Sequence, residues 1–161
     1  MALRNIVLEG DEILRKRCRE VTTIDDRIRM ILDDMIETMR SQNGVGIAAP
    51  QVGVMRRMFV IEPEDGEVIE FINPEVIESS GTQTGEEGCL SVPGYVGTVD
   101  RPEYIKVEAL DRYGEKIEHE GTGIKAVAIS HELDHLEGVL YIDKAEEIHE
   151  ASADPDDSEE Q

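Results

Sequence analysis

The sequence predicts an α+β fold, with mainly antiparallel sheets packed around a central C-terminal helix and with an amphipathic helix near the N-terminus. Two segments have the apolar spacing of helices, residues 25–40 and 124–136, and short apolar runs between turn residues fill the region between them. Strands that follow one another without intervening helices favour antiparallel pairing. The 161 residues are enough for one domain with a hydrophobic core of its own.

The N-terminal helix is predicted at residues 25–40. The run Thr-Thr-Ile-Asp-Asp, which ends at Asp26, provides capping side chains and negative charge for the first turn. Asn43 and Gly44 are typical of a helix end. A shorter helix is expected at residues 11–19. The apolar side chains at helical spacing in the longer helix are Ile28, Ile31, Leu32, Met35 and Met39.

Short strands are predicted where apolar residues alternate, or where they stand between turn residues. The expected strands cover residues 58–62, 67–72, 75–80, 104–110, 116–120 and 139–142. Asn73 and Pro74 are expected to separate the second strand from the third, because proline cannot donate a hydrogen bond to a sheet. Residues 85–94, rich in glycine, are expected to be irregular.

The acidic composition argues against several classes of partner. Asp and Glu number 37 against 16 Lys and Arg, so the net charge is −21 at pH 7. Such a charge opposes binding to nucleic acid or to an anionic membrane surface, and no apolar run is long enough to cross a bilayer. The first ten residues lack the pattern of a signal peptide, which predicts a cytoplasmic protein. Cys18 and Cys89 are too few for a disulfide scaffold.

The predicted C-terminal helix is apolar on nearly every side, which is typical of an interior helix. It nevertheless carries His131, Glu132, Asp134 and His135, and burying four ionisable groups is costly unless something satisfies them. His131 and His135 are four residues apart, so both imidazoles can reach one metal ion, with Glu132 beside it. The pattern is that of metal-dependent hydrolases in which the glutamate acts as general base.

A catalytic metal site of this kind needs a third protein ligand and an open position. Tyr141 stands where one group of zinc proteases has a third histidine, and the glutamates beyond residue 145 begin an acidic segment that would fix a ligand poorly. Cys89, next to Gly88 in the irregular segment, is the preferred third ligand. Two alternatives stay open on these residues: a His-Glu-x-x-His zinc peptidase with its third ligand after the helix, and an acidic binding module with a structural metal.

Three motifs occur along the chain in the order Gly44-Val45-Gly46-Ile47-Ala48-Ala49-Pro50-Gln51, Glu87-Gly88-Cys89-Leu90-Ser91 and His131-Glu132-Leu133-Asp134-His135. With them the chain resembles the peptide deformylases over about residues 5–145. This family removes the N-formyl group from nascent polypeptides that begin with formyl-methionine. On this resemblance, residues 1–147 form a single catalytic domain. Residues 148–161 lie outside the resemblance, and their acidic, polar composition predicts a disordered tail.

The resemblance implies a metal-dependent hydrolysis. Cys89, His131 and His135 would hold one divalent metal ion, iron(II) in the cell and zinc, nickel or cobalt in purified protein. A water on the metal would attack the formyl carbon, with Glu132 acting as general base and then as general acid. The partners implied are the N-formylated nascent peptide and, transiently, the ribosome, without direct binding to nucleic acid or membrane.

The resemblance also assigns substrate contacts. The side-chain amide of Gln51 and the backbone N–H of Leu90 would meet the oxyanion that develops on the formyl group. Asp134 cannot point with the histidines, and Arg101 is its expected partner. The substrate-binding residues are Val45, Gly46 and Gly88, through their backbone, and Ile124, Val127 and Ala128, through side chains that line a methionine pocket.

Overall fold

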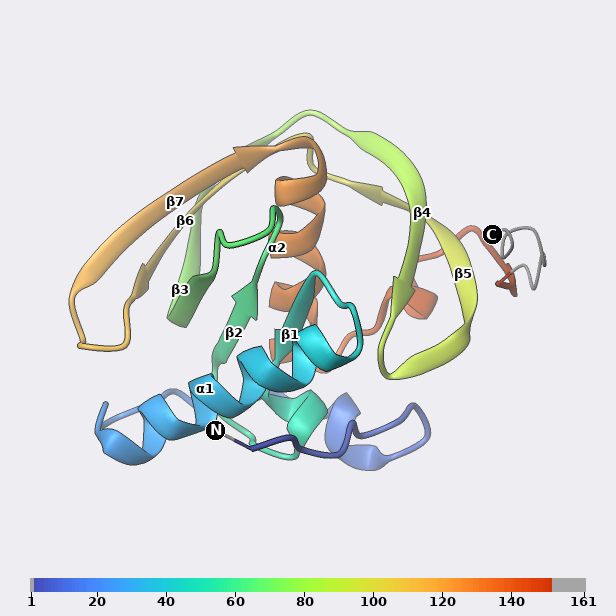
Figure 1. Cartoon of the computed structure of the whole chain (residues 1–161). Helices are drawn as coiled ribbons and strands as arrows, with labels where there is room; N and C mark the ends of the chain where they lie inside the picture. Colours follow the sequence, from blue (N-terminus) through green and yellow to red (C-terminus); the bar gives the residue numbers. More distant parts are fainter. Residues whose placement is uncertain (1, 152–161) are drawn as a thin grey trace.

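The computed structural model describes residues 2–151, which form two antiparallel sheets and two α-helices (Figure 1). One sheet has the order β1-β2-β3-β6-β7 and the other the order β4-β5-β8. The strands of the first are β1 (Gly46–Ala48), β2 (Met58–Ile61), β3 (Ile69–Ser80), β6 (Tyr104–Leu110) and β7 (Lys116–Thr122). Those of the second are β4 (Gln83–Cys89), β5 (Val92–Arg101) and β8 (Glu147–Glu150). All neighbouring strands are antiparallel, so the predicted α+β class with antiparallel sheets is confirmed.

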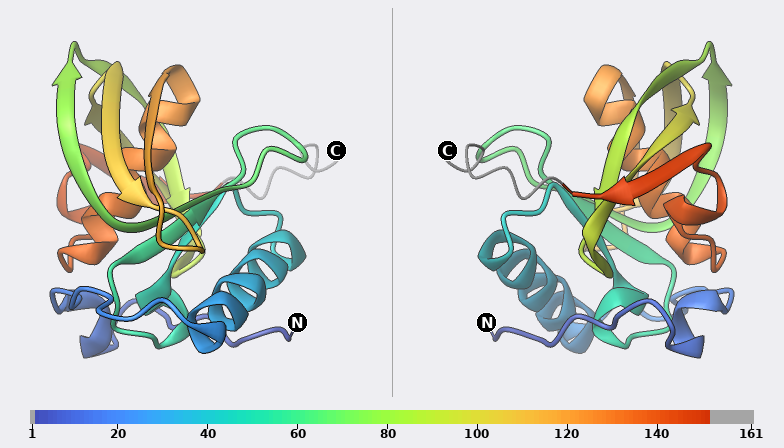
Figure 2. Two further views of the ribbon diagram at one scale, coloured as in Figure 1. Left: turned by 90° about the vertical axis from the view of Figure 1, so that its left-hand side faces the viewer. Right: turned by 90° about the vertical axis from the view of Figure 1, so that its right-hand side faces the viewer.

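Helix α1 (Asp26–Ser41) lies across the lower end of the molecule in Figure 1, and the turned views show it well apart from α2 (Figure 2). The Asp25 side chain caps the helix by accepting a hydrogen bond of 3.1 Å from the Ile28 amide. The inner face of α1 packs against β1 and β2 in one apolar cluster. Its members from α1 include the five apolar positions predicted from helical spacing, all of them buried.

Helix α2 (Gly123–Leu136) runs between the two sheets (Figure 1). It contacts β1, β2, β6 and β7 of one sheet and β5 of the other. Ile124 is its one exposed residue, which agrees with a sequence that is apolar on nearly every side. None of the helices within residues 2–151 is long and apolar enough to cross a membrane.

Strand β3 differs from the prediction because it runs through Asn73 and Pro74 without a break. Asn73 has a positive φ of 51°, and its side chain makes two hydrogen bonds of 2.9 Å with the backbone of Val21. The register against β6 shifts at this point. A bulge therefore accommodates the proline, and the second and third expected strands are one.

The segment expected to be irregular, residues 85–94, belongs to a β-hairpin. Strands β4 and β5 pair up to Cys89 and Val92, which leaves Leu90 and Ser91 as the turn. Glycines lower the intrinsic strand propensity of this segment, but pairing with the neighbouring strand outweighs that preference. The hairpin matters for the site because it carries Cys89 to the edge of the second sheet.

Near the N-terminus, the helix expected at residues 11–19 is reduced to one 3₁₀ turn, η1 (Glu12–Arg15). The chain is extended from Lys16 onward, and the Cys18 amide donates a hydrogen bond of 2.9 Å to the Leu136 carbonyl at the end of α2. In a helix over residues 11–19 the Cys18 amide would instead donate to a carbonyl of the same helix, so the bond to α2 competes with that helix.

The C-terminal part differs from the expected boundary at residue 147. Residues 139–142 contain no strand, and a single 3₁₀ turn, η3 (Tyr141–Asp143), follows α2. Residues 148–150, expected in the acidic tail, belong to β8, since their backbone groups pair with β5 whatever the charge of their side chains. The remainder of the expected tail, residues 152–161, lies outside the described residues.

Candidate metal and active site

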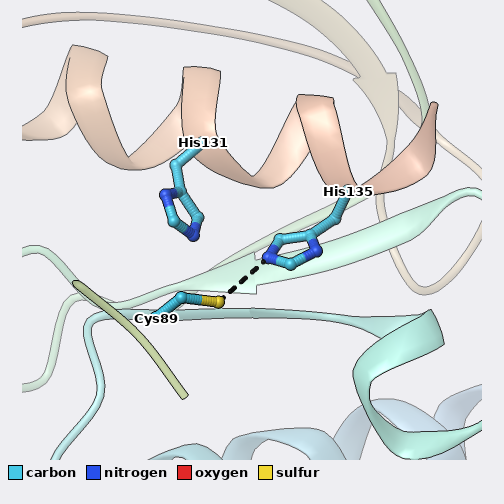
Figure 3. Close-up of side chains that lie close together, drawn as sticks. All are labelled: Cys89, His131 and His135. Atoms are coloured by element: carbon cyan, nitrogen blue, oxygen red, sulfur yellow. Dashed lines mark hydrogen bonds between the residues drawn. The ribbon is translucent and has the colours of Figure 1, made fainter. Parts of the chain in front are cut away.

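Three side chains with metal-ligand chemistry converge between α2 and the end of β4. His131 and His135 project from α2 toward Cys89 (Figure 3), and one ligand atom from each of the three lies within 4.8 Å of the others. Sγ of Cys89 is 3.4 Å from Nε2 of His135. Sulfur and nitrogen ligands of a tetrahedral zinc ion stand about 3.6 Å apart at ordinary bond lengths. The three groups therefore fit one ion.

A distortion in the hairpin aims Cys89. It is the last residue of β4, and the pairing of β4 with β5 is irregular between Glu87 and Cys89, at Gly88. Such a bulge re-aims the side chain that follows it. The other cysteine, Cys18, is 2% exposed, and burial raises the pKa of its thiol to about 11, so it packs as a small neutral side chain.

A buried carboxylate orients His131 from behind. Oε1 of Glu87 lies 3.0 Å from Nδ1 of His131, which leaves Nε2 for a metal. Arg101 donates two hydrogen bonds of 2.8 Å to Glu87 and one of 2.7 Å to Asp134. Burial alone would raise the pKa of Glu87, but Arg101 and His131 lower it to about 2. The expected Arg101–Asp134 pair is confirmed. A carboxylate that accepts from the second ring nitrogen of a histidine is a common feature of metal sites.

Glu132 presents a buried carboxylate oxygen without a hydrogen-bond partner. It is 4% exposed, and its Oε1 makes no hydrogen bond within residues 2–151. Nδ1 of His135 is the other buried side-chain atom of that kind in this part of the chain. Burial raises the pKa of Glu132 to about 7. A carboxylate whose pKa is near neutrality can both take and return a proton at physiological pH.

The pKa values of the two histidines are shifted in opposite directions. Burial alone would lower the pKa of His131, but its interactions with Cys89 and Glu87 raise the pKa to about 10. Burial lowers the pKa of His135 well below the ordinary value for histidine. A metal ion must therefore displace a proton from this cluster, so binding should release protons and weaken in acid.

Gln51 lies in the 3₁₀ turn η2 (Ala49–Val52), directly after β1, and is 1% exposed. Its Oε1 accepts a hydrogen bond of 2.9 Å from the Ala48 amide, and its Nε2 donates one of 3.0 Å to Oγ of Ser91. The same Nε2 is 3.6 Å from Sγ of Cys89. The side-chain amide thus presents a donor beside the candidate metal ligands.

A cavity of about 390 Å³ joins these groups to the surface. Every site residue predicted from the sequence lines it except His135, which is 1% exposed. Ile124 is 65% exposed and stands at the mouth, whereas Ala128 is 9% exposed and lies deeper. The predicted residues in the lining are Val45, Gly46, Gln51, Gly88, Cys89, Leu90, Ile124, Val127, Ala128, His131 and Glu132.

Residues 3–151 match the family model described as polypeptide deformylase. The chain belongs to the peptide deformylase family. Enzymes of this family are metal-dependent hydrolases that act on N-formylated nascent peptides, and the candidate metal site described above agrees with that class.

Named relatives and solved structures agree with this family. The peptide deformylase of Acetivibrio thermocellus is 56% identical over 144 residues, which are 89% of this chain and 84% of that protein. Peptide deformylase 1 of Clostridium perfringens is 54% identical over 144 residues, 89% of this chain and 98% of that protein. The crystal structure of peptide deformylase from Thermotoga maritima has a TM-score of 0.88 at 41% identity and covers 91% of this chain and 100% of that one.

Several residues at this candidate site have no role in the predictions made from sequence. Glu87 and Ser91 stand in the second motif, where an acid two positions before the expected cysteine ligand is the one available signal. Asn43 lines the cavity although the sequence indicates only a helix end there. The roles of Glu87 and Ser91 depend on contacts with α2 and η2, which local patterns do not encode.

Proposed function

We propose that this chain hydrolyses the formyl group from the N-terminal formyl-methionine of nascent polypeptides. The proposal is carried by one observation, the meeting of Cys89, His131 and His135 beside a cavity that the unpartnered Oε1 of Glu132 also adjoins. Family membership supports the same reaction. The amide bond between the formyl carbon and the methionine nitrogen breaks, and the products are formate and a peptide with a free amino group.

Cys89, His131 and His135 would hold one divalent metal ion. One thiolate and two imidazoles leave room for a fourth ligand, as catalytic rather than structural sites do. This donor set suits several ions; iron(II) is proposed for the cell on the family resemblance, and zinc, nickel or cobalt for purified protein. When bound, such an ion polarises a carbonyl oxygen and lowers the pKa of a coordinated water.

Glu132 would move the protons. Its free Oε1 accepts a proton from the attacking water, and the oxygen of that water forms the new bond to the formyl carbon. As the carbon–nitrogen bond breaks, the same carboxyl returns the proton to the leaving amine. The pKa of about 7 that burial imposes on Glu132 supports both transfers, because neither direction is strongly uphill near neutral pH.

Gln51 and Leu90 would stabilise the oxyanion that develops on the formyl oxygen. The Gln51 amide is held on both sides, and its Nε2 is close to Sγ of Cys89. Leu90 follows Cys89 in the hairpin turn and lines the same cavity, so its backbone N–H is a second donor within reach. Donors already in position cost no rearrangement at the moment of reaction.

The substrate peptide would lie extended between β1 and β4. Each is the end strand of its sheet, and Val45, Gly46 and Gly88 line the cavity between them. Unpaired backbone groups at such edges can pair with an added strand. The methionine side chain would enter the apolar part of the cavity beside Ile124, Val127 and Ala128, the last of which is deepest.

The partners proposed are the N-formylated nascent peptide and, for short encounters, the ribosome that presents it. A cytoplasmic location follows from that substrate. The net charge of −21 supports the absence of direct binding to nucleic acid or to an anionic membrane.

Measuring metal content together with deformylation of formyl-Met-Ala tests the proposal. Cys89→Ala should lose both metal and activity, whereas Glu132→Gln should keep the metal and lose about 10²-fold or more in kcat. Cys18→Ala, the control for a cysteine outside the cavity, should keep both. Wild-type activity in Glu132→Gln would refute the proton-transfer role. Cleavage of unformylated peptides by Cys89→Ala that still holds metal would indicate instead a zinc peptidase with another third ligand.

A further inference from the structure

The N-terminal residues 2–9 contain no helix or strand, yet their amides bind to successive parts of the molecule. The amides of Ala2 and Arg4 donate to side chains of α1. The Val7 amide then donates a hydrogen bond of 2.8 Å to the Gln51 carbonyl, and the Glu9 amide donates one of 2.7 Å to the Ser91 carbonyl. The segment thus leaves α1, passes η2 and reaches the hairpin turn after β4.

Gln51 and Ser91 are also joined by their side chains. Oε1 of Gln51 is occupied by the Ala48 amide, so the amide group cannot flip without losing that bond. One hydrogen on Nε2 goes to Oγ of Ser91, at 3.0 Å. The second hydrogen is donated to Sγ of Cys89, 3.6 Å from Nε2, and sulfur is a weak acceptor that an oxygen beside Cys89 can replace. By holding one hydrogen of Nε2, the Ser91 hydroxyl fixes the direction of the second N–H, which points toward Cys89.

The two residues belong to different sheets. Gln51 follows β1 of the five-stranded sheet, and Ser91 precedes β5 of the three-stranded sheet. Within residues 2–151, no backbone hydrogen bond joins η2 directly to the turn at Leu90 and Ser91. The backbone link between them runs through Val7 and Glu9. A change of a few tenths of an ångström between the sheets would therefore move the Gln51 donor relative to the Leu90 donor.

We propose that Val7, Glu9 and the Ser91 hydroxyl form a brace that positions the Gln51 amide for the reaction. Ser91 is then a positioning residue, and residues 7–9 are part of the support of the active site. The inference rests on the role proposed above for Gln51 as an oxyanion donor. The brace acts on kcat more than on KM, because the oxyanion exists only in the transition state.

Two variants break the brace and two matched variants leave it intact. Ser91→Ala removes the acceptor for the Gln51 amide, and Glu9→Pro removes the backbone donor to Ser91. Leu8→Pro is the proline control, since the Leu8 amide makes no hydrogen bond within residues 2–151. Thr38→Val is the control for a weaker attachment of the N-terminal segment. It removes the acceptor for the Arg4 amide on α1, away from the cavity.

Kinetics on formyl-Met-Ala, at equal metal content, should separate these variants. Ser91→Ala and Glu9→Pro should lower kcat about tenfold and change KM by no more than about twofold. This loss of kcat is smaller than the roughly 10²- to 10³-fold loss expected when Gln51→Ala removes the donor itself. Leu8→Pro and Thr38→Val should keep wild-type kcat. In a Gln51→Ala background, Ser91→Ala should cause no further loss, because the two residues act through one donor.

A second readout does not depend on turnover. In metal-free protein, the side-chain amide hydrogens of Gln51, assigned by their loss in Gln51→Ala, should exchange with solvent faster in Ser91→Ala than in wild type. Two results would overturn the brace even if Glu9→Pro failed to fold. One is an unchanged exchange rate in Ser91→Ala, and the other is an equal loss of kcat when Ser91→Ala is made in wild type and in Gln51→Ala. Wild-type activity in Gln51→Ala would instead refute the oxyanion role and the brace with it. An inactive Gln51→Ala beside fully active Ser91→Ala and Glu9→Pro would refute the brace alone.

Discussion

A Cβ atom on Gly46 would lie 2.6 Å from Oε2 of Glu132 and 3.1 Å from its Cδ. Strand β1 therefore approaches α2 so closely at this point that no side chain fits between them. The approach holds the carboxylate in place, because Glu132 cannot swing toward β1 without a clash.

Gly46→Ala should displace the Glu132 carboxylate and lower kcat for formyl-Met-Ala by about 10²-fold, since misplacement of a reacting group by about 1 Å has that effect. Metal content should be unchanged, because a Cβ on Gly46 would meet Glu132 and none of the three proposed ligands. Gly85→Ala is the matched control, as a Cβ there meets nothing within 4 Å. A Gly46→Ala variant with wild-type kcat would show that the close approach does not control the position of Glu132.

Arg101 should control metal affinity without touching the metal. In Arg101→Met the buried Glu87 loses two hydrogen bonds and Asp134 loses one. Breaking a buried ion pair on one side costs about 3–5 kcal/mol, and losing the group that orients a histidine ligand weakens metal binding about 10- to 100-fold. Urea unfolding and metal titration measure the two effects.

The control for this variant is Arg40→Met, which breaks a pair with Glu62 in which the arginine side chain is 51% exposed. That change should leave both the free energy of unfolding and the metal affinity close to those of wild type, because solvent screens an exposed ion pair. Equal metal affinity in Arg101→Met and wild type would contradict the proposed link through Glu87 to His131.

Asp34 should make stability depend on pH. Burial alone would raise its pKa, but hydrogen bonds from the Ala2 amide and from Arg4 lower it. A carboxyl whose pKa is depressed in the folded state stabilises the fold above the unfolded pKa of about 4, and the effect is lost as the pH falls through the folded pKa. Asp34→Asn should therefore lower the free energy of unfolding by about 2 kcal/mol at pH 7, as expected for hydrogen bonds to a charged group.

The difference in the free energy of unfolding between wild type and Asp34→Asn should narrow as the pH falls from 7 to about 3. Urea titrations at each pH measure this gap. Release of metal in acid affects both proteins alike, so it cancels in the difference. A gap that stayed constant over this range would mean that the pKa of Asp34 is not depressed.

Alanine substitutions at Gly138 and Gly114 distinguish the cost of backbone strain from the cost of a steric clash. Both have positive φ, 78° and 84°, so alanine at either position costs about 1–2 kcal/mol in strain. A Cβ at Gly138 would also lie 2.5 Å from the Arg15 carbonyl oxygen, whereas one at Gly114 meets only Ile24, at 3.8 Å. Gly138→Ala should therefore lower the free energy of unfolding clearly more than Gly114→Ala, as thermal or urea unfolding will show. Equal losses would mean that the chain relaxes around Arg15 at no cost.

Elements that depend on local interactions could be predicted from the sequence, whereas elements that depend on a distant partner could not. Helix α1 lies within one residue of its expected bounds, because capping and apolar spacing are local properties. The hairpin of β4 and β5 was not predicted, because a strand rich in glycine depends on its partner rather than on its own propensity. The same holds for β8, whose acidic side chains suggest a tail although its backbone pairs with β5.

The local pattern was enough to show that His131 and His135 face one way on α2, because residues four apart on a helix share a face whatever surrounds them. It also indicated Cys89 as the third ligand, by its chemistry and its motif. The contact between Cys89 and His135, 46 residues further along the chain, depends on the folded arrangement of the hairpin and α2. The tertiary structure also decided that Glu87 backs His131 and that Gly46 confines Glu132. These contacts cross between elements that sheet pairing brings together, and the distance between two such elements is not encoded in the local pattern of either.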